Sequence, residues 1–241
     1  MARIACQYAR LSELVSDEAQ AAARWLSADE RRAWESMRSA ERKRTWLGGR
    51  TLAKRMLLQL LGETTWQRVA AAEIHIETRS TRPGHGERPV VFVGGERLDC
   101  GLSIAHTSRG VLVAVSRDVD LALGVDLVCR ADASPGGLAW SLSTRERHWL
   151  ATGPRNQRSG EQIWAMKEAL YKAAQRGEGF SPAQIETVPG CPPTYPGTNA
   201  ADVQSLESWR VDGHYAALAV VRHREQPPAP VAADGLLAAT A

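Results

Sequence analysis

The stretch GVLVAVSRDVDLALGVDLV, residues 110–128, restricts the fold of this chain more than any other part of the sequence. It contains two apolar segments, Val111–Val115 and Leu121–Val128, which are separated by the polar pair Arg117–Asp118. Short runs of β-branched and aliphatic residues on either side of a polar break are typical of neighbouring β-strands. The stretch therefore predicts two strands of a sheet with mostly buried faces.

The second of these strands carries a single carboxylate. Because successive side chains point to opposite faces of a strand, four aliphatic residues share one face: Leu121, Leu123, Val125 and Leu127. Asp126 is expected on the other face, beside Gly124 and Val128. A carboxylate in so apolar a strand costs free energy unless something compensates its charge. A cap on a following turn, exposure at the surface and a bound metal ion all remain open from the spacing alone.

The region before these strands is expected to begin with helices. Residues 1 to about 66 have mostly helical periodicity, and Ser27 followed by Glu30 forms a predicted capping box. Apolar residues then recur at helical spacing from Leu47 to Leu61, and Gly62 is expected to end that helix. Two further strands are predicted after it, at residues 73–78 (EIHIET) and 88–93 (RPVVFV).

The last third of the chain mixes helix and strand. It follows a Gly/Pro-rich break at residues 133–137 and contains predicted helices near residues 144–150 and 164–173. Residues 208–221 predict a hairpin with Asp212–Gly213 as its turn. The Pro- and Ala-rich residues 225–241 predict a disordered tail. The whole pattern indicates an α/β (α+β) fold.

Composition excludes several classes of protein. Of the 241 residues, 44% are hydrophobic and 24% are charged, and the formal net charge is only +3. We therefore expect a globular core and no nucleic-acid partner, since the basic residues between 31 and 55 alternate with acidic ones and lack an aromatic stacking platform. No apolar run is long enough for a membrane span, and the N-terminus lacks a signal peptide, so no membrane partner is expected. The four widely spaced cysteines suit free thiols in a reducing cytoplasm.

The helix WAMKEALYKA, residues 164–173, places two charged residues one turn apart. Its apolar stripe consists of Ile163, Met166, Leu170 and Ala174. Glu168 and Lys172 lie away from that stripe, in the order that favours an i, i+4 ion pair on a helix surface. From the helix alone, such a surface pair and a working acid–base pair both remain open.

Several other polar residues have two interpretations. His106 is expected in a turn before a strand, where it is either an exposed loop residue or a ligand-binding one. Arg88 and the cluster from Arg44 to Arg50 can bind phosphates bidentately, although each is equally an ordinary solvated charge on its own.

The order of these elements resembles the 4′-phosphopantetheinyl transferase superfamily. The resemblance rests on GVD, residues 124–126, followed by WAMKEALYKA, which matches the pattern W-x-x-K-E-[AS]-x-x-K-[AG]. The segments SIAHTSRGVLVAV (103–115), RTWLGGRTLAKRMLLQLLG (44–62) and RGEGFS (176–181) are similar to further parts of the family pattern. The similarity extends from about residue 25 to residue 222.

The resemblance implies a particular architecture. The chain length is similar to that of the long, Sfp-type branch, which carries two similar α/β subdomains related by a pseudo-two-fold axis in one monomer. The active site would lie in the cleft between them. Residues 1–117 would form the N-terminal half and residues 118–224 the C-terminal half.

The resemblance also implies a reaction. The family transfers the phosphopantetheine arm of coenzyme A to a serine of an apo-carrier protein and releases adenosine 3′,5′-bisphosphate. The carriers are acyl or peptidyl carrier proteins of fatty-acid, polyketide or nonribosomal-peptide synthesis. Mg²⁺, with Mn²⁺ as an alternative, would be held by Asp126 and Glu168. Glu168 would also act as the general base, and Lys172 would contact the diphosphate. The residues that would bind coenzyme A phosphates are His106, Arg88, Arg44 and Arg50, with Arg32, Thr45, Thr107 and Lys167 as further candidates.

Three positions depart from the family pattern or remain open within it. Val128 stands where many long members have a third carboxylate. Water would then replace the missing ligand, or the protein would be catalytically silent and bind coenzyme A or carrier without transfer. Ala105 replaces a frequent serine before His106. Glu146 falls where the family often has an acidic residue, and it is either an auxiliary metal ligand or, as we expect, a helix-surface residue.

Overall fold

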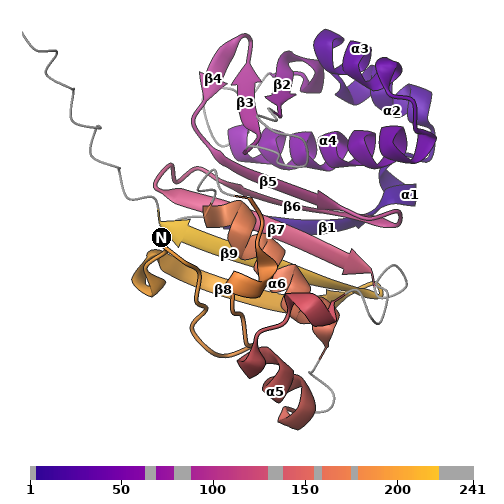
Figure 1. Ribbon diagram of the computed structural model, residues 1–241. Helices are drawn as coiled ribbons and strands as arrows, with labels where there is room; N and C mark the ends of the chain where they lie inside the picture. Colours follow the sequence, from indigo (N-terminus) through magenta and orange to yellow (C-terminus); the bar gives the residue numbers. More distant parts are fainter. Residues whose placement is uncertain are drawn as a thin grey trace, which may run out of the picture.

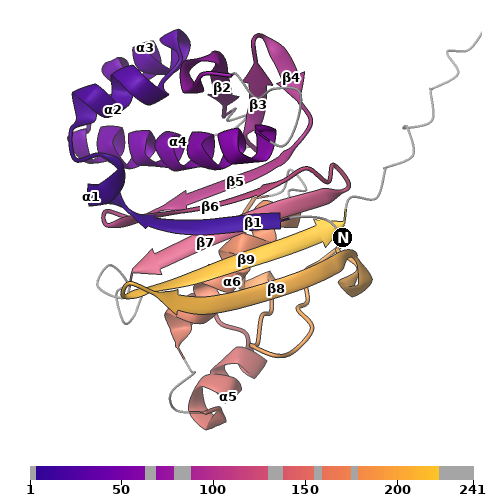
Figure 2. The ribbon, with the colours of Figure 1, turned by 180° about the vertical axis from the view of Figure 1, so that it is seen from behind.

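The computed structural model describes residues 4–62, 69–78, 88–129, 138–154, 159–174 and 179–222. Within these ranges, two three-stranded antiparallel sheets pack against each other, and each carries a long helix on its outer face (Figures 1 and 2). The fold is thus the mixed helix-and-strand fold that the sequence predicts.

Within the described residues, the N-terminal part contains four α-helices and two three-stranded sheets, of which one has shorter strands. Its helices are α1 (Leu11–Leu14), α2 (Glu18–Trp25), α3 (Ala28–Ser36) and α4 (Ala40–Leu61), with the short 3₁₀ turn η1 (Ala71–Glu73). Its larger sheet has the order β1-β6-β5, formed by β1 (Ile4–Arg10), β5 (Gly101–His106) and β6 (Gly110–Ser116). Its smaller sheet has the order β2-β3-β4, formed by β2 (Ile74–Glu77), β3 (Val90–Val93) and β4 (Glu96–Leu98).

The prediction of mostly helical structure for residues 1 to about 66 does not hold for β1. This strand pairs along its whole length with β6, from Ile4 opposite Ser116 to Arg10 opposite Gly110. The partner strand lies about a hundred residues away in the sequence, so local periodicity holds no sign of the pairing. The predicted capping box of Ser27 and Glu30 and the helix end at Gly62 are confirmed.

The C-terminal part repeats the arrangement of a sheet with a helix. Its strands β7 (Leu121–Cys129), β8 (Val203–Val211) and β9 (His214–Arg222) have the order β7-β9-β8. Its helices are α5 (Thr144–Thr152) and α6 (Gly160–Ala174), and its 3₁₀ turns are η2 (Ala139–Ser141), η3 (Pro182–Gln184) and η4 (Ala200–Asp202). The predicted hairpin turn is confirmed, since Asp212 and Gly213 have φ values of 47° and 76°, as a type I′ turn requires.

The larger sheets of the two parts have the same strand order. In each, the first strand pairs with the last, and the last pairs with the strand before it. Both parts also bury a glutamate that follows a serine cap: Glu30 in α3 and Glu146 in α5. Each glutamate forms an ion pair with a fully buried lysine of the long helix, Lys54 in α4 and Lys167 in α6.

The two sheets meet in an apolar layer to which β7 contributes the four residues predicted on its aliphatic face. Leu112 and Ala114 of β6, and Ala216 and Val220 of β9, pack against that face. The alternation predicted for β7 is therefore confirmed. Val125 N also donates to Ser103 Oγ of β5 at 3.0 Å, so β5 and β7 lie side by side across the junction.

Some predictions fall outside the described residues. They concern the break at 133–137, most of the RGEGFS segment and the tail at 225–241. Within the described ranges, no helix has the length and apolar character needed to cross a lipid bilayer.

Candidate active site

The site is built on the contact between strand β7 and helix α6. Gly124 makes this contact possible, because a Cβ at that position would lie only 1.9 Å from Ala169 O and 2.5 Å from Ala173 N. The small residues of α6 complete the fit, since Ala165, Ala169 and Ala173 are fully buried. The close approach explains why glycine precedes the strand carboxylate, and it brings the polar face of α6 to Asp126.

Two carboxylates, one from each element, converge on a single ammonium. Lys172 Nζ lies 2.6 Å from Asp126 Oδ1 and 3.6 Å from Glu168 Oε2. The side chains of Asp126, Glu168 and Lys172 are 11%, 22% and 32% exposed, so a ligand can still reach the group. Asp126 and Glu168 therefore both lie beside the same positive charge.

The electrostatics of the three groups favour proton transfer at Glu168. Burial raises the pKa of the Glu168 carboxyl, Lys172 lowers it, and Asp126 raises it again, with a net upward shift. For Lys172, desolvation opposes the charged form, but the carboxylates of Asp126 and Glu168 outweigh it and raise the pKa. The lysine thus stays cationic, whereas the glutamate is placed to take up a proton.

His106 brings the N-terminal part to the same site. It is the last residue of β5, directly before the turn in which the sequence predicted it, so the predicted location is wrong. The residue is exposed, yet the surrounding chain partly desolvates its imidazole and lowers its pKa. The charges of Lys172 and Arg50 lower this pKa further, while that of Asp126 raises it. These charges act on His106 from α4, α6 and β7 together.

The predicted phosphate-binding residues of α4 differ in their availability. Arg50 is only 4% exposed, lies over the Trp46 ring at 4.5 Å, and donates to Thr78 Oγ1 at 2.9 Å. Burial lowers the pKa of Arg50 to about 10. Arg44 is exposed on the same helix, whereas the buried Thr45 donates its hydroxyl proton to carbonyls of its own helix.

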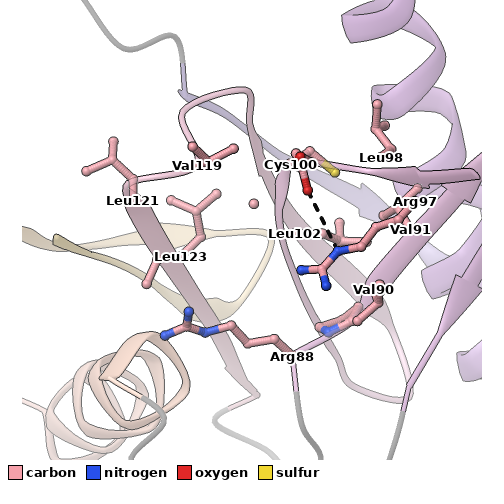
Figure 3. Close-up of a pocket in the computed structure, with 14 residues that line it drawn as sticks. Arg88, Val90, Val91, Arg97, Leu98, Cys100, Leu102, Val119, Leu121 and Leu123 are labelled. Atoms are coloured by element: carbon pink, nitrogen blue, oxygen red, sulfur yellow. Dashed lines mark ion pairs between the residues drawn. The ribbon is translucent and has the colours of Figure 1, made fainter. Parts of the chain in front are cut away.

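Arg32 and Arg88 are both engaged with the protein. Arg32 is exposed on α3 and pairs with Asp29. Arg88 donates through Nη2 to Ala173 O in the last turn of α6, and burial lowers its pKa to about 10. In Figure 3, its side chain extends towards that helix, away from the loop that carries Val119. Arg88 also borders a cavity of about 170 Å³ between the small sheet and the start of β7 (Figure 3).

Glu146 and Lys167 form a closed structural pair, which corrects the expectation of a surface position for Glu146. Both side chains are 0% exposed, and Lys167 Nζ lies 2.7 Å from Glu146 Oε2. The carboxylate also accepts from Thr187 N and Ser143 N, each at 2.7 Å. Lys167 donates further to Ser141 O and Pro182 O. With these partners, neither side chain is available to a metal ion or to coenzyme A.

Val128 is half-buried and packs against the core beneath α6. Its apolar side chain supplies no third carboxylate beside Asp126 and Glu168. Across the part of the chain that the structure describes, no group of three or more His, Cys, Asp or Glu residues is arranged to hold a metal ion. The two carboxylates of Asp126 and Glu168 are the hard oxygen ligands that Mg²⁺ prefers, so the chemistry of this pair would fit that ion.

Sequence comparison finds a similarity to one known family over part of the chain. Residues 122–219 match the sequence model of the 4′-phosphopantetheinyl transferase superfamily, a region that includes Asp126, Glu168 and Lys172. The match covers less than half of the chain and leaves out His106, Arg88 and α4. No curated protein matches the chain. Residues 122–219 are therefore similar to the phosphopantetheinyl transferase superfamily.

Sequence reasoning missed a polar cluster beside the site. It links Thr107, the residue after His106, to His214 of β9, and links the β8–β9 turn at Asp212 to Arg10 of β1. The Asp-Gly turn was recognisable, but the partners of Asp212 and His214 lie about two hundred and about one hundred residues earlier, in β1 and in the turn after β5. No local pattern connects residues at that separation.

Proposed function

We propose that this protein is a long, Sfp-type 4′-phosphopantetheinyl transferase that acts as a cytoplasmic monomer on coenzyme A and an apo-carrier protein. The observation that carries the proposal is the convergence of Asp126 and Glu168 on Lys172, within the region that matches the superfamily model. The shared strand order of the two parts supports two similar halves, residues 1–117 and 118–224, with the site between them.

The reaction exchanges one phosphorus–oxygen bond for another. The carrier serine oxygen bonds to the phosphorus that bears the pantetheine arm, and the bond from that phosphorus to the bridging diphosphate oxygen breaks. The serine proton passes to Glu168, whose raised pKa suits a general base. Adenosine 3′,5′-bisphosphate leaves with its new negative charge beside the Lys172 ammonium, which stabilises it.

Asp126 and Glu168 are the residues that would hold Mg²⁺. When bound there, the ion neutralises diphosphate charge and polarises the phosphoryl group. Lys172 contacts both carboxylates, so its ammonium would lie next to an ion held by them.

The N-terminal half would hold coenzyme A. His106 lies within electrostatic reach of Lys172 and is exposed, so it is placed to contact a coenzyme A phosphate. Arg44 is exposed, and Arg50 adds its positive charge to the same region. Arg88, which precedes β3, places its guanidinium against the last turn of α6 and would contribute from there. Interactions of this kind position the substrate rather than change its chemistry.

Mass spectrometry of carrier proteins tests the proposal. The protein is incubated with coenzyme A, Mg²⁺ and a panel of apo-carriers from fatty-acid, polyketide and nonribosomal-peptide systems. We expect at least one carrier to gain the mass of a phosphopantetheine group, with no gain when coenzyme A is omitted or Mg²⁺ is chelated. No gain across the panel, together with tight binding of coenzyme A, would instead support a catalytically silent member, the alternative that Val128 favours.

A further inference from the structure

The turn that follows His106 is held by a buried histidine of the opposite half. Thr107 Oγ1 lies 2.9 Å from His214 Nε2, and His214 is only 1% exposed. The same hydroxyl oxygen accepts from Arg109 N and Gly110 N, each at 3.2 Å. One side chain therefore closes the β5–β6 turn and ties it to β9.

The partners fix the direction of these hydrogen bonds. His214 Nδ1 lies 2.9 Å from Asp212 O, and a carbonyl oxygen only accepts, so Nδ1 carries the proton. The neutral ring then has an acceptor at Nε2, to which the Thr107 hydroxyl donates. A second ring proton at Nε2 would instead face an oxygen that already accepts two backbone N–H groups. The arrangement thus fits one tautomer of a neutral His214.

The hairpin that presents His214 is itself fastened to β1. Arg10 binds the Asp212 carboxylate with two hydrogen bonds of 2.8 Å, and Tyr8 donates to it at 2.9 Å. The Tyr8 ring also covers Gly110, because a Cβ there would lie 2.4 Å from the ring. Strand β1 and the β8–β9 hairpin therefore hold the β5–β6 turn from two sides.

His106 depends on that turn for its position. Among the described residues, no side-chain hydrogen bond of its own holds the His106 imidazole, whereas the backbone next to it is fixed through Thr107. We propose that His214 is a positioning residue for coenzyme A binding, which acts through Thr107 to hold the β5–β6 turn and thereby His106. This inference rests on the proposed function, in which His106 contacts a coenzyme A phosphate.

A phosphate contact remote from the reacting phosphorus changes substrate affinity rather than the rate of the bound complex. Thr107→Val and His214→Phe should therefore each raise KM for coenzyme A about five- to tenfold, the value of one lost hydrogen bond, and leave kcat within about twofold. Thr107→Ser keeps the hydroxyl and should restore KM. The double variant should be no worse than either single one, because both remove the same link.

Ser116→Ala is the matched control. Ser116 lies at the other end of β6 and likewise accepts a backbone N–H through its hydroxyl, from Asp118 at 3.0 Å. Its loss should lower stability to a similar extent without any change in KM for coenzyme A. If Thr107→Val raises KM while His214→Phe does not, Thr107 contacts coenzyme A directly and the proposal is overturned. Unchanged KM in both variants overturns it as well.

A second measurement separates this inference from the proposed function. The His106 ring resonance is followed by NMR in the protein without substrate. It should shift in Thr107→Val and in His214→Phe, and stay in place in Thr107→Ser and Ser116→Ala. If the wild-type protein neither binds coenzyme A nor modifies a carrier, the proposed function fails, but such shifts still support the coupling. A resonance that stays in place in every variant overturns the coupling, whatever the enzyme does.

Discussion

Glu168 and Lys172 have the spacing of an ordinary pair on a helix surface, and a pair of that kind contributes only about 0.3–0.5 kcal/mol. The contact with Asp126 distinguishes Glu168 and Lys172 from such a surface pair. The ammonium lies 2.6 Å from Asp126 and 3.6 Å from Glu168, so it is bound more closely by the strand than by its own helix. Glu168 keeps a raised pKa even with Lys172 nearby. A carboxyl that is partly buried and only loosely paired is suited to accept a proton.

Glu168→Gln should reduce phosphopantetheine transfer by about 10²- to 10⁴-fold, since the amide cannot accept the serine proton. The fold should persist, because Lys172 retains its contact with Asp126. Initial rates from carrier mass spectrometry and a thermal melting curve measure the two effects. Transfer at near wild-type rate would remove Glu168 from the role of base.

Val128→Glu should strengthen metal binding by adding a third carboxylate on the strand face of Asp126. The Mg²⁺ concentration for half-maximal transfer should fall, and isothermal titration of Mg²⁺ without coenzyme A should show tighter binding than in the wild type. Val128→Gln, which has a similar size but no charge, serves as the control. An unchanged Mg²⁺ requirement would mean that residue 128 does not face the ion.

At the scale of elements, the site depends on how closely α6 lies on β7. Gly124→Ala would push a methyl group to within 1.9 Å of Ala169 O, a backbone atom that cannot move alone. We expect a loss of about 1–3 kcal/mol in the free energy of unfolding, together with a displaced α6 and reduced transfer. Urea denaturation measures the first effect.

Gly160→Ala is the control for that substitution. A Cβ at Gly160, in the first turn of the same helix, meets its nearest atom, Leu138 Cδ1, at an ordinary 3.5 Å. Its stability should therefore equal or slightly exceed that of the wild type. If both alanine variants were equally stable, the close contact at Gly124 would not limit the packing of α6.

The β8–β9 turn makes a prediction about acid stability. Hydrogen bonds from Arg10 and Tyr8 lower the pKa of Asp212 from its ordinary value of 3.8 to about 2. A depressed carboxyl pKa stabilises the folded state above the unfolded pKa, and that stabilisation is lost as pH falls through the folded one. The stability difference between wild type and Asp212→Asn should therefore be constant above about pH 5 and shrink towards pH 2. Urea titrations at several pH values measure it, and a difference independent of pH would contradict it.

At the scale of the whole molecule, the two halves share one apolar layer. Leu112 and Ala114 of the first half, and Val125 and Ala216 of the second, are fully buried between the sheets. Either half alone would expose this layer to water, and large exposed apolar faces lead to association.

Chains cut between residues 117 and 118 test this dependence. Each half expressed alone should be aggregated or unfolded, whereas the two halves expressed together should form one soluble complex. Circular dichroism and size-exclusion chromatography measure the outcome. A single half that is folded and monomeric would show that the layer between the sheets is not required for its fold.

The sequence by itself determined the elements whose cause is local. The capping box of Ser27, the alternation of β7, the Asp-Gly turn and the spacing of Glu168 and Lys172 are all readable within a few residues. Caps, turns and side-chain periodicity depend on neighbours in the chain, so the printed sequence holds the necessary information.

Tertiary structure decided everything that depends on distant partners. It turned residues 4–10 into a strand, buried Glu146 against Lys167, and moved the Lys172 ammonium to Asp126. It also joined Thr107 to His214 across more than a hundred residues. The physical reason is that strand pairing and desolvation depend on which groups are in contact in the folded protein. Contacts between residues far apart in the sequence form only in the complete fold.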